Sequence, residues 1–74
     1  MALLDVIEVM AQSDTSWEDA AQDAIQTASK TVRGIQSIYI KEFQAVVENG
    51  KITQYRVDAK ITFVLQGDYG ISAG

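Results

Sequence analysis

Residues 35–65, IQSIYIKEFQAVVENGKITQYRVDAKITFVL, decide the fold of this chain. Two long strand-like runs flank Asn49-Gly50. Asn-Gly between apolar runs is a strong hairpin signal, because a type I′ turn needs a positive φ at both central residues. From Gln54 to Phe63 the second run alternates polar and apolar residues. This alternation predicts a strand with one buried face.

The register of the hairpin follows from the length of its turn. A two-residue loop at Asn49-Gly50 would set Ile38 against Ile61. The same register pairs three apolar residues near the turn with positions on the opposite face: Phe43, Ala45 and Val47 against Arg56, Gln54 and Ile52. Either a β-bulge at Lys41-Glu42 re-aims these side chains, or the strand stays straight and each half is apolar on a different side. In both cases one small helix cannot cover the apolar surface, which predicts an oligomer.

Length and composition bound the possible functions. The 74 residues predict a single domain over 1–66 and a loose tail over 67–74. The chain has no Cys and no His, which excludes disulfides, thiolate metal sites and the commonest general base. A net charge of −4 argues against nucleic-acid binding, and no apolar run approaches a membrane span. The first residues lack the basic segment of a signal peptide, so we expect a cytoplasmic protein.

The N-terminal half predicts a strand followed by a helix. Residues 3–11 are nearly all apolar, as in a strand with contacts on both faces. Thr15 and Ser16 are both candidate helix caps. From Trp17 to Val32 the apolar residues, mostly alanine, recur at helical spacing, with Gly34 as the stop. The predicted fold class is therefore α+β, in the order β-α-β-β.

Several motifs together resemble the dodecin family. They are Ser13-x-x-Ser16-Trp17-Glu18-x-Ala20, Thr31-Val32-Arg33, Ile38-x-Ile40-Lys41-Glu42 and Gly50-Lys51-Ile52-x-x-Tyr55-Arg56-Val57. The resemblance implies a three-stranded antiparallel sheet wrapped around one helix, and a hollow homododecamer. It also implies a binding or storage protein rather than an enzyme, with a flavin such as FMN or riboflavin as the usual ligand of the family.

Two positions depart from the flavin-binding pattern of that family. Ser37 stands where flavin-binding members have a stacking Trp, and Arg56 stands where they commonly have a Gln. Tyr39 is the nearest aromatic residue to the missing platform. We therefore predict a ligand pocket between subunits at Ser37, Tyr39 and Arg56, with weakened flavin binding. The alternative is an exposed strand serine, an interface tyrosine and an arginine in an ion pair on the strand face. Arg56 suits an anionic ligand because its guanidinium makes bidentate hydrogen bonds.

The alternative hypothesis is a flavin-free dodecameric shell that binds divalent cations such as calcium or magnesium. The resemblance extends to a dodecin subgroup with a proposed calcium site, but identifies no ligands in this sequence. Two sets of carboxylates are candidates: Glu18, Asp19 and Asp23 near the helix start, where capping is the other interpretation, and Glu8, Glu42 and Glu48 on the strands. Trp17 is either a stacking residue or, on its alanine-rich face, a packing anchor.

Overall fold

The computed structural model describes residues 2–65 and consists of a three-stranded antiparallel sheet and one helix. The elements are β1 (Leu4–Ser13), α1 (Trp17–Ala28), β2 (Ile35–Glu48) and β3 (Lys51–Val64). The sheet order is β1-β3-β2, so β3 is central and both other strands are edges. This is the predicted β-α-β-β fold, while the predicted tail over 67–74 lies outside the described residues.

The hairpin turn has the geometry that its sequence predicts. Asn49 and Gly50 take φ values of 53° and 75°, as a turn with two positive φ angles requires. Nothing lies within 4 Å of the place where a Cβ would stand on Gly50, so its positive φ is the reason for a glycine here. Beyond this turn, Glu48 pairs with Lys51 and Val47 with Ile52.

A β-bulge at Lys41 corrects part of the predicted register. Ile38 pairs with Ile61 as predicted, but the register shifts between Ile40 and Glu42. Phe43 therefore pairs with Val57 rather than with Arg56. Ala45 likewise pairs with Tyr55 rather than with Gln54, and a second shift between Val46 and Val47 restores the predicted pairing at the turn. The bulge interpretation is confirmed, and the straight strand with two apolar sides is wrong.

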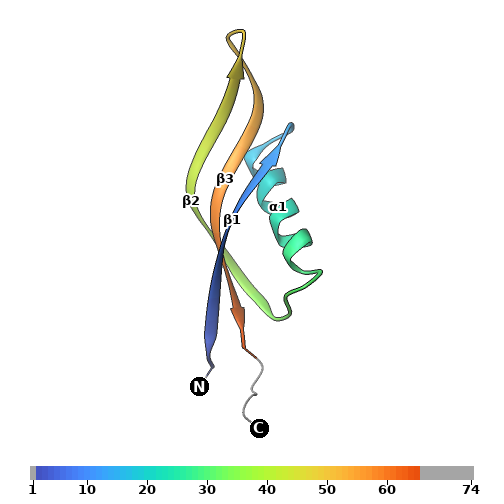
Figure 1. Cartoon of the computed structure of the whole chain (residues 1–74), viewed down its shortest axis with the longest axis vertical. Helices are drawn as coiled ribbons and strands as arrows, with labels where there is room; N and C mark the ends of the chain where they lie inside the picture. The colour runs from blue at the N-terminus through green and yellow to red at the C-terminus, as the bar shows by residue number, and fades with distance from the viewer. Residues whose placement is uncertain (1, 66–74) are drawn as a thin grey trace.

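The bulge at Lys41 puts Phe43 and Ala45 on the face that carries the helix, because they pair with Val57 and Tyr55. Paired residues of an antiparallel sheet point to the same face, and Val57 is fully buried beneath α1. Phe43 therefore points to the helix side as well. However, the hairpin extends past the helix at the end opposite the termini (Figure 1). Phe43, Val47 and Ile52 consequently remain 65%, 60% and 50% exposed, so one helix indeed leaves apolar surface uncovered.

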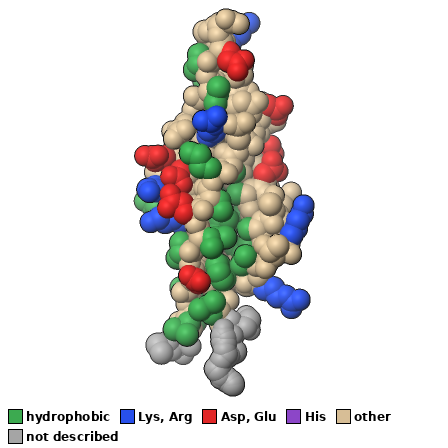
Figure 2. All heavy atoms as spheres, in the orientation of Figure 1, with side chains coloured by type: hydrophobic (Ala, Val, Ile, Leu, Met, Phe, Trp, Pro, Cys, Tyr) green, Lys and Arg blue, Asp and Glu red, His purple; other side chains and the backbone are tan. Residues whose placement is uncertain are grey.

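The core lies between α1 and the middle of β3. Its buried residues are small or β-branched: Ala20, Ala24, Val57, Ala59 and Ile61. Alanines on the helix let its backbone approach the sheet closely, as the alanine-rich stripe predicts. In Figure 2 hydrophobic side chains gather beside the helix in the lower half of the visible face.

The sequence predicts the start of the helix correctly but not its end. Ser16 is the N-cap, and its Oγ accepts a hydrogen bond of 3.0 Å from the Asp19 backbone N–H. The helix then ends at Ala28 rather than near Val32, and its C-cap Ser29 donates from Oγ to the Ile25 carbonyl oxygen at 2.7 Å. Gly34 has a positive φ of 75° but lies in the loop before β2, so it is not the helix stop.

Candidate functional site

The sheet face opposite the helix, called here the outer face, holds the predicted ligand residues. Ser37 pairs with Thr62 and Tyr39 with Lys60, so both lie on the same face of the sheet as the polar residues of β3. Arg56 lies on the same face, six residues from Thr62 along the strand. At about 3.3 Å per residue this separation is about 20 Å. One chain thus brings Ser37 and Tyr39 together but leaves Arg56 apart, and a pocket between subunits stays a prediction.

A flat ligand at Ser37 would need a nearby aromatic side chain on which to stack. Tyr39 is 64% exposed and Ser37 is exposed. Trp17 lies on the other side of the sheet, where it makes edge contacts with Tyr55 and Phe43 at ring-centroid distances of 5.0 and 5.8 Å. Its indole Nε1–H also donates to the Gln44 carbonyl oxygen at 2.8 Å. Trp17 is therefore a packing anchor and is not available as a platform near Ser37.

A row of charged side chains crosses the outer face at Asp58, two residues after Arg56 on β3. Lys41 Nζ lies 3.4 Å from Glu8 Oε2 and links the two edge strands across β3. Asp58 lies between them, since it pairs with Met10 on β1 and with Glu42 on β2. Diagonal neighbours on one face of a sheet are within reach of long side chains, so Glu8 and Asp58 form a carboxylate pair.

The pKa values of the two carboxyls in this pair are shifted in opposite directions. A hydrogen bond from the Asp58 carboxyl lowers the pKa of Glu8, and the nearby Lys41 ammonium lowers it further. The same hydrogen bond to Glu8 is the main cause that raises the pKa of Asp58 above its ordinary value. The partnership with Glu8 also raises the pKa of Lys41. Two close carboxylates cannot both ionise freely, which is the condition that a bound cation would relieve.

Carboxylate oxygens are the ligands that calcium and magnesium prefer. Glu8 and Asp58 fit a divalent cation in donor type and in charge. However, residues 2–65 contain no cluster of three or more acidic side chains that could hold a metal ion. One chain therefore supplies part of a coordination shell, and the remaining oxygens would have to come from water or from another copy.

Of the three carboxylates at the start of α1, Asp19 has a structural role. Asp19 accepts a 2.7 Å hydrogen bond at Oδ2 from the Oγ of Ser13, which is buried. Ser13 Oγ also accepts from the Thr15 backbone N–H at 2.9 Å. This network closes the connection from β1 to α1, and in it the Asp19 carboxylate bonds the Ser13 hydroxyl rather than a backbone N–H of the helix. Glu18 and Asp23 are exposed on the helix surface.

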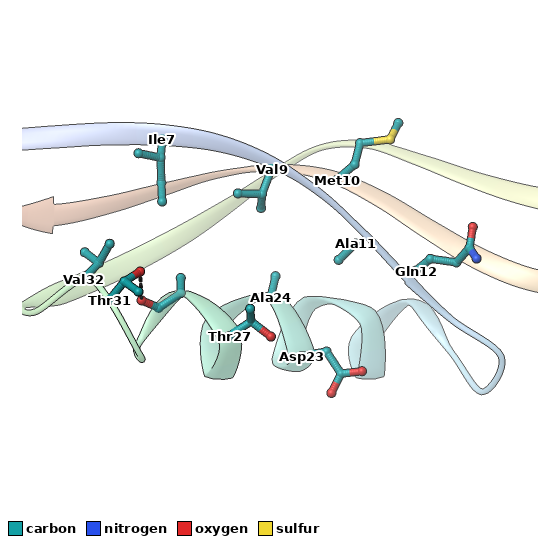
Figure 3. Close-up of a pocket in the computed structure, with 11 residues that line it drawn as sticks. Ile7, Val9, Met10, Ala11, Gln12, Asp23, Ala24, Thr27, Thr31 and Val32 are labelled. Carbon is teal, nitrogen blue, oxygen red and sulfur yellow. Dashed lines mark hydrogen bonds between the residues drawn. The ribbon is translucent and has the colours of Figure 1, made fainter.

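A groove of about 490 Å³ runs between α1 and the edge strand β1. Ile7, Val9 and Ala11 point from β1 towards the helix, whereas Met10 points away from it (Figure 3). The opposite wall comes from the helix, with Ala24 and Thr27 among its lining residues. The lining is mainly apolar and carries no reactive group other than Asp23. Its chemistry suits packing rather than catalysis.

The chain is thus a small β-α-β-β module with uncovered apolar surface and a polar outer face. A family profile described as Dodecin matches residues 3–66. The chain belongs to the dodecin family, whose members are binding proteins that form homododecamers rather than enzymes.

Two dodecins with solved structures are similar to this chain. The calcium dodecin of Mycobacterium tuberculosis is 37% identical over 67 residues, which cover 89% of this chain and 93% of that protein. Its crystal structure is described as having a novel calcium-binding site, and matches with a TM-score of 0.75, 33% identity and coverage of 89% and 94%. The dodecin of Streptomyces coelicolor matches with a TM-score of 0.84, 25% identity and coverage of 88% and 93%.

The remaining sequence predictions concern location and nucleic-acid binding. Within residues 2–65 there is no helix long and apolar enough to cross a membrane. The cytoplasmic location and the absence of nucleic-acid binding stay predictions.

Proposed function

We propose that this chain assembles as a hollow homododecamer that binds calcium or a similar divalent cation. The observation that carries the proposal is the Glu8–Asp58 carboxylate pair on the outer face, with its opposed pKa shifts. The 37% identity to a calcium dodecin supports the same ligand class. Flavin is the weaker candidate, because Ser37 offers no ring and Trp17 is engaged on the other side of the sheet.

Lys41 occupies the position that a cation would have to take over. Its ion pair with Glu8 is exposed, with 46% of each side chain accessible. Exposed ion pairs of this kind contribute little to stability, so a divalent cation can displace the ammonium at low cost. Symmetry then multiplies the oxygens, because each pair lies close to an edge strand that another copy can approach.

Titration calorimetry with Ca²⁺ and Mg²⁺ on the assembled, chelator-treated protein tests the proposal. We expect binding by the wild type and a loss of at least tenfold in the double variant Glu8→Gln, Asp58→Asn. Asp23→Asn, which removes an exposed charge from the helix, serves as the matched control and should bind like the wild type. Equal affinity in the double variant and in the wild type would contradict this location.

The pH dependence of calcium binding provides a second test. The raised pKa of Asp58 means that this carboxyl keeps its proton to a higher pH than an ordinary aspartic acid. Calcium must displace that proton, so the affinity should fall as the pH is lowered towards the raised pKa. In Asp58→Asn the dependence should be shallower. A dependence that is unchanged in this variant would show that Asp58 is not a ligand.

A further inference from the structure

Three glutamines surround Arg56 on the outer face. Gln12 on β1 and Gln44 on β2 both pair directly with Arg56, so one row of polar side chains spans the three strands. Gln54 lies two residues before Arg56 on β3 and therefore on the same face. Arg56 and Gln54 are half-buried, whereas Gln12 and Gln44 are exposed. This arrangement is called the Arg56 row.

A hydrogen bond orients the arginine and one of the amides. Arg56 Nε donates to Gln12 Oε1 at 2.7 Å. A guanidinium only donates, so Gln12 must present its oxygen to it, and the amide NH₂ of Gln12 is left as a donor. The terminal Nη groups of Arg56 are likewise donors that this bond does not use. The hydrogen-bonding capacity that remains in the Arg56 row is therefore rich in donors.

The charge of Arg56 is not neutralised by its neighbours. Within the part of the chain that the structure describes, the one ion pair joins Lys41 to Glu8, and Arg56 takes part in none. The nearest acidic side chain of its own strand face, Asp58, is directed to Glu8 instead. A half-buried cation with neutral amides around it, in a chain of net charge −4, calls for an anionic partner.

We infer that the Arg56 row binds an oxyanion group, a phosphate or a carboxylate, of a small-molecule ligand. Arg56 would make a bidentate contact with two oxygens, and the amide NH₂ groups of Gln12, Gln44 and Gln54 would donate to the others. Gln12 acts as a positioning residue, since its oxygen holds the guanidinium in place. This inference goes beyond the calcium proposal and does not depend on it, because it concerns a different row of residues and a ligand of opposite charge.

Calorimetric titration of the assembled protein with inorganic phosphate, in a zwitterionic buffer of low ionic strength, tests this inference. We expect Arg56→Gln to weaken phosphate binding about tenfold or more, because a charge-assisted bidentate contact is lost. Arg56→Lys should give an intermediate affinity, since it keeps the charge but loses the fork. Gln12→Leu should weaken binding a few-fold without changing the charge. Lys51→Gln removes a positive charge at the hairpin tip and serves as the control.

The outcomes separate a built site from general electrostatics. Binding that is lost in Arg56→Gln and retained in Lys51→Gln supports the inference, and a parallel titration with acetate decides whether carboxylates bind as well. Equal weakening in the two variants would overturn it, as would the absence of phosphate and acetate binding in the wild type. If Arg56→Gln fails to assemble, Arg56→Lys and Gln12→Leu decide. A calcium titration of the same samples keeps the two proposals distinguishable, since either ligand can bind when the other does not.

Discussion

Val47→Asp is expected to break the assembly of the protein. Val47 lies near the tip of the hairpin, beyond the reach of the helix, and is 60% exposed in one chain. Full burial of a valine side chain is worth about 1.5–3 kcal/mol, so covering the exposed share in an interface stabilises by about 1–2 kcal/mol per copy. An aspartate would forfeit this gain and would also place an unpaired carboxylate in an apolar contact, which costs several kcal/mol more.

Size-exclusion chromatography with light scattering measures this effect at several protein concentrations. Val47→Thr is the matched control, because threonine keeps the β-branched shape and the strand propensity without adding a charge. We expect Val47→Thr to assemble with only a modest loss and Val47→Asp to elute as small species. A Val47→Asp protein with the native size and the native melting temperature would show that this end of the hairpin is not an interface.

Three further predictions concern the core, the acidic pair and the ligand platform. Ile61→Ala should lower the free energy of unfolding by about 2–5 kcal/mol in denaturant titrations at fixed protein concentration, and Ile61→Val by about 0.5–1.5 kcal/mol, because Ile61 is fully buried. The lowered pKa of Glu8 adds stability above the ordinary pKa of a glutamate, and this stability is lost as the pH falls through the lowered value. Glu8→Gln should therefore flatten the fall in melting temperature at acid pH. Glu18→Gln, the control, should leave this fall unchanged. Ser37→Trp should increase flavin affinity in fluorescence-quenching titrations, and an unchanged affinity would contradict the pocket at Ser37.

The hairpin was the most predictable part of the fold, because its turn chemistry is local. Asn49-Gly50 demands two positive φ angles, and this fixes the pairing of Val47 with Ile52 whatever the rest of the chain does. The sequence alone does not decide between a bulge at Lys41 and a straight strand. The presence of the bulge depends on whether the helix offers a surface for Phe43 to pack on, and that is a tertiary contact.

The end of the helix was less predictable for a similar reason. The apolar period continues to Val32, but Ser29 donates its hydroxyl to the Ile25 carbonyl and the chain turns from there. Such local side-chain bonds compete with the continuation of the helix, and the β-branched Thr31 and Val32 have a low helix propensity. Periodicity alone does not reveal which of these effects wins.

The outer-face rows were beyond sequence reasoning because they depend on the pairing of β1 with β3. Alternation predicts that Arg56 and Asp58 share a face, but no turn of fixed length sets Gln12 against Arg56 or brings Glu8 near Asp58. Strands more than forty residues apart in sequence find their register through the packing of both against the helix. The predicted residue Arg56 is on the expected face, whereas its glutamine partners were missed.

Copies of this chain are expected to cover one another's exposed apolar residues, among them Phe43, Val47 and Ile52. A native mass spectrum of the dilute wild-type protein without denaturant tests this expectation most directly. We expect a single species of twelve subunits, with no folded monomer at concentrations where the assembly persists. A stable, folded monomer under these conditions would show that the exposed apolar residues need no second copy to cover them.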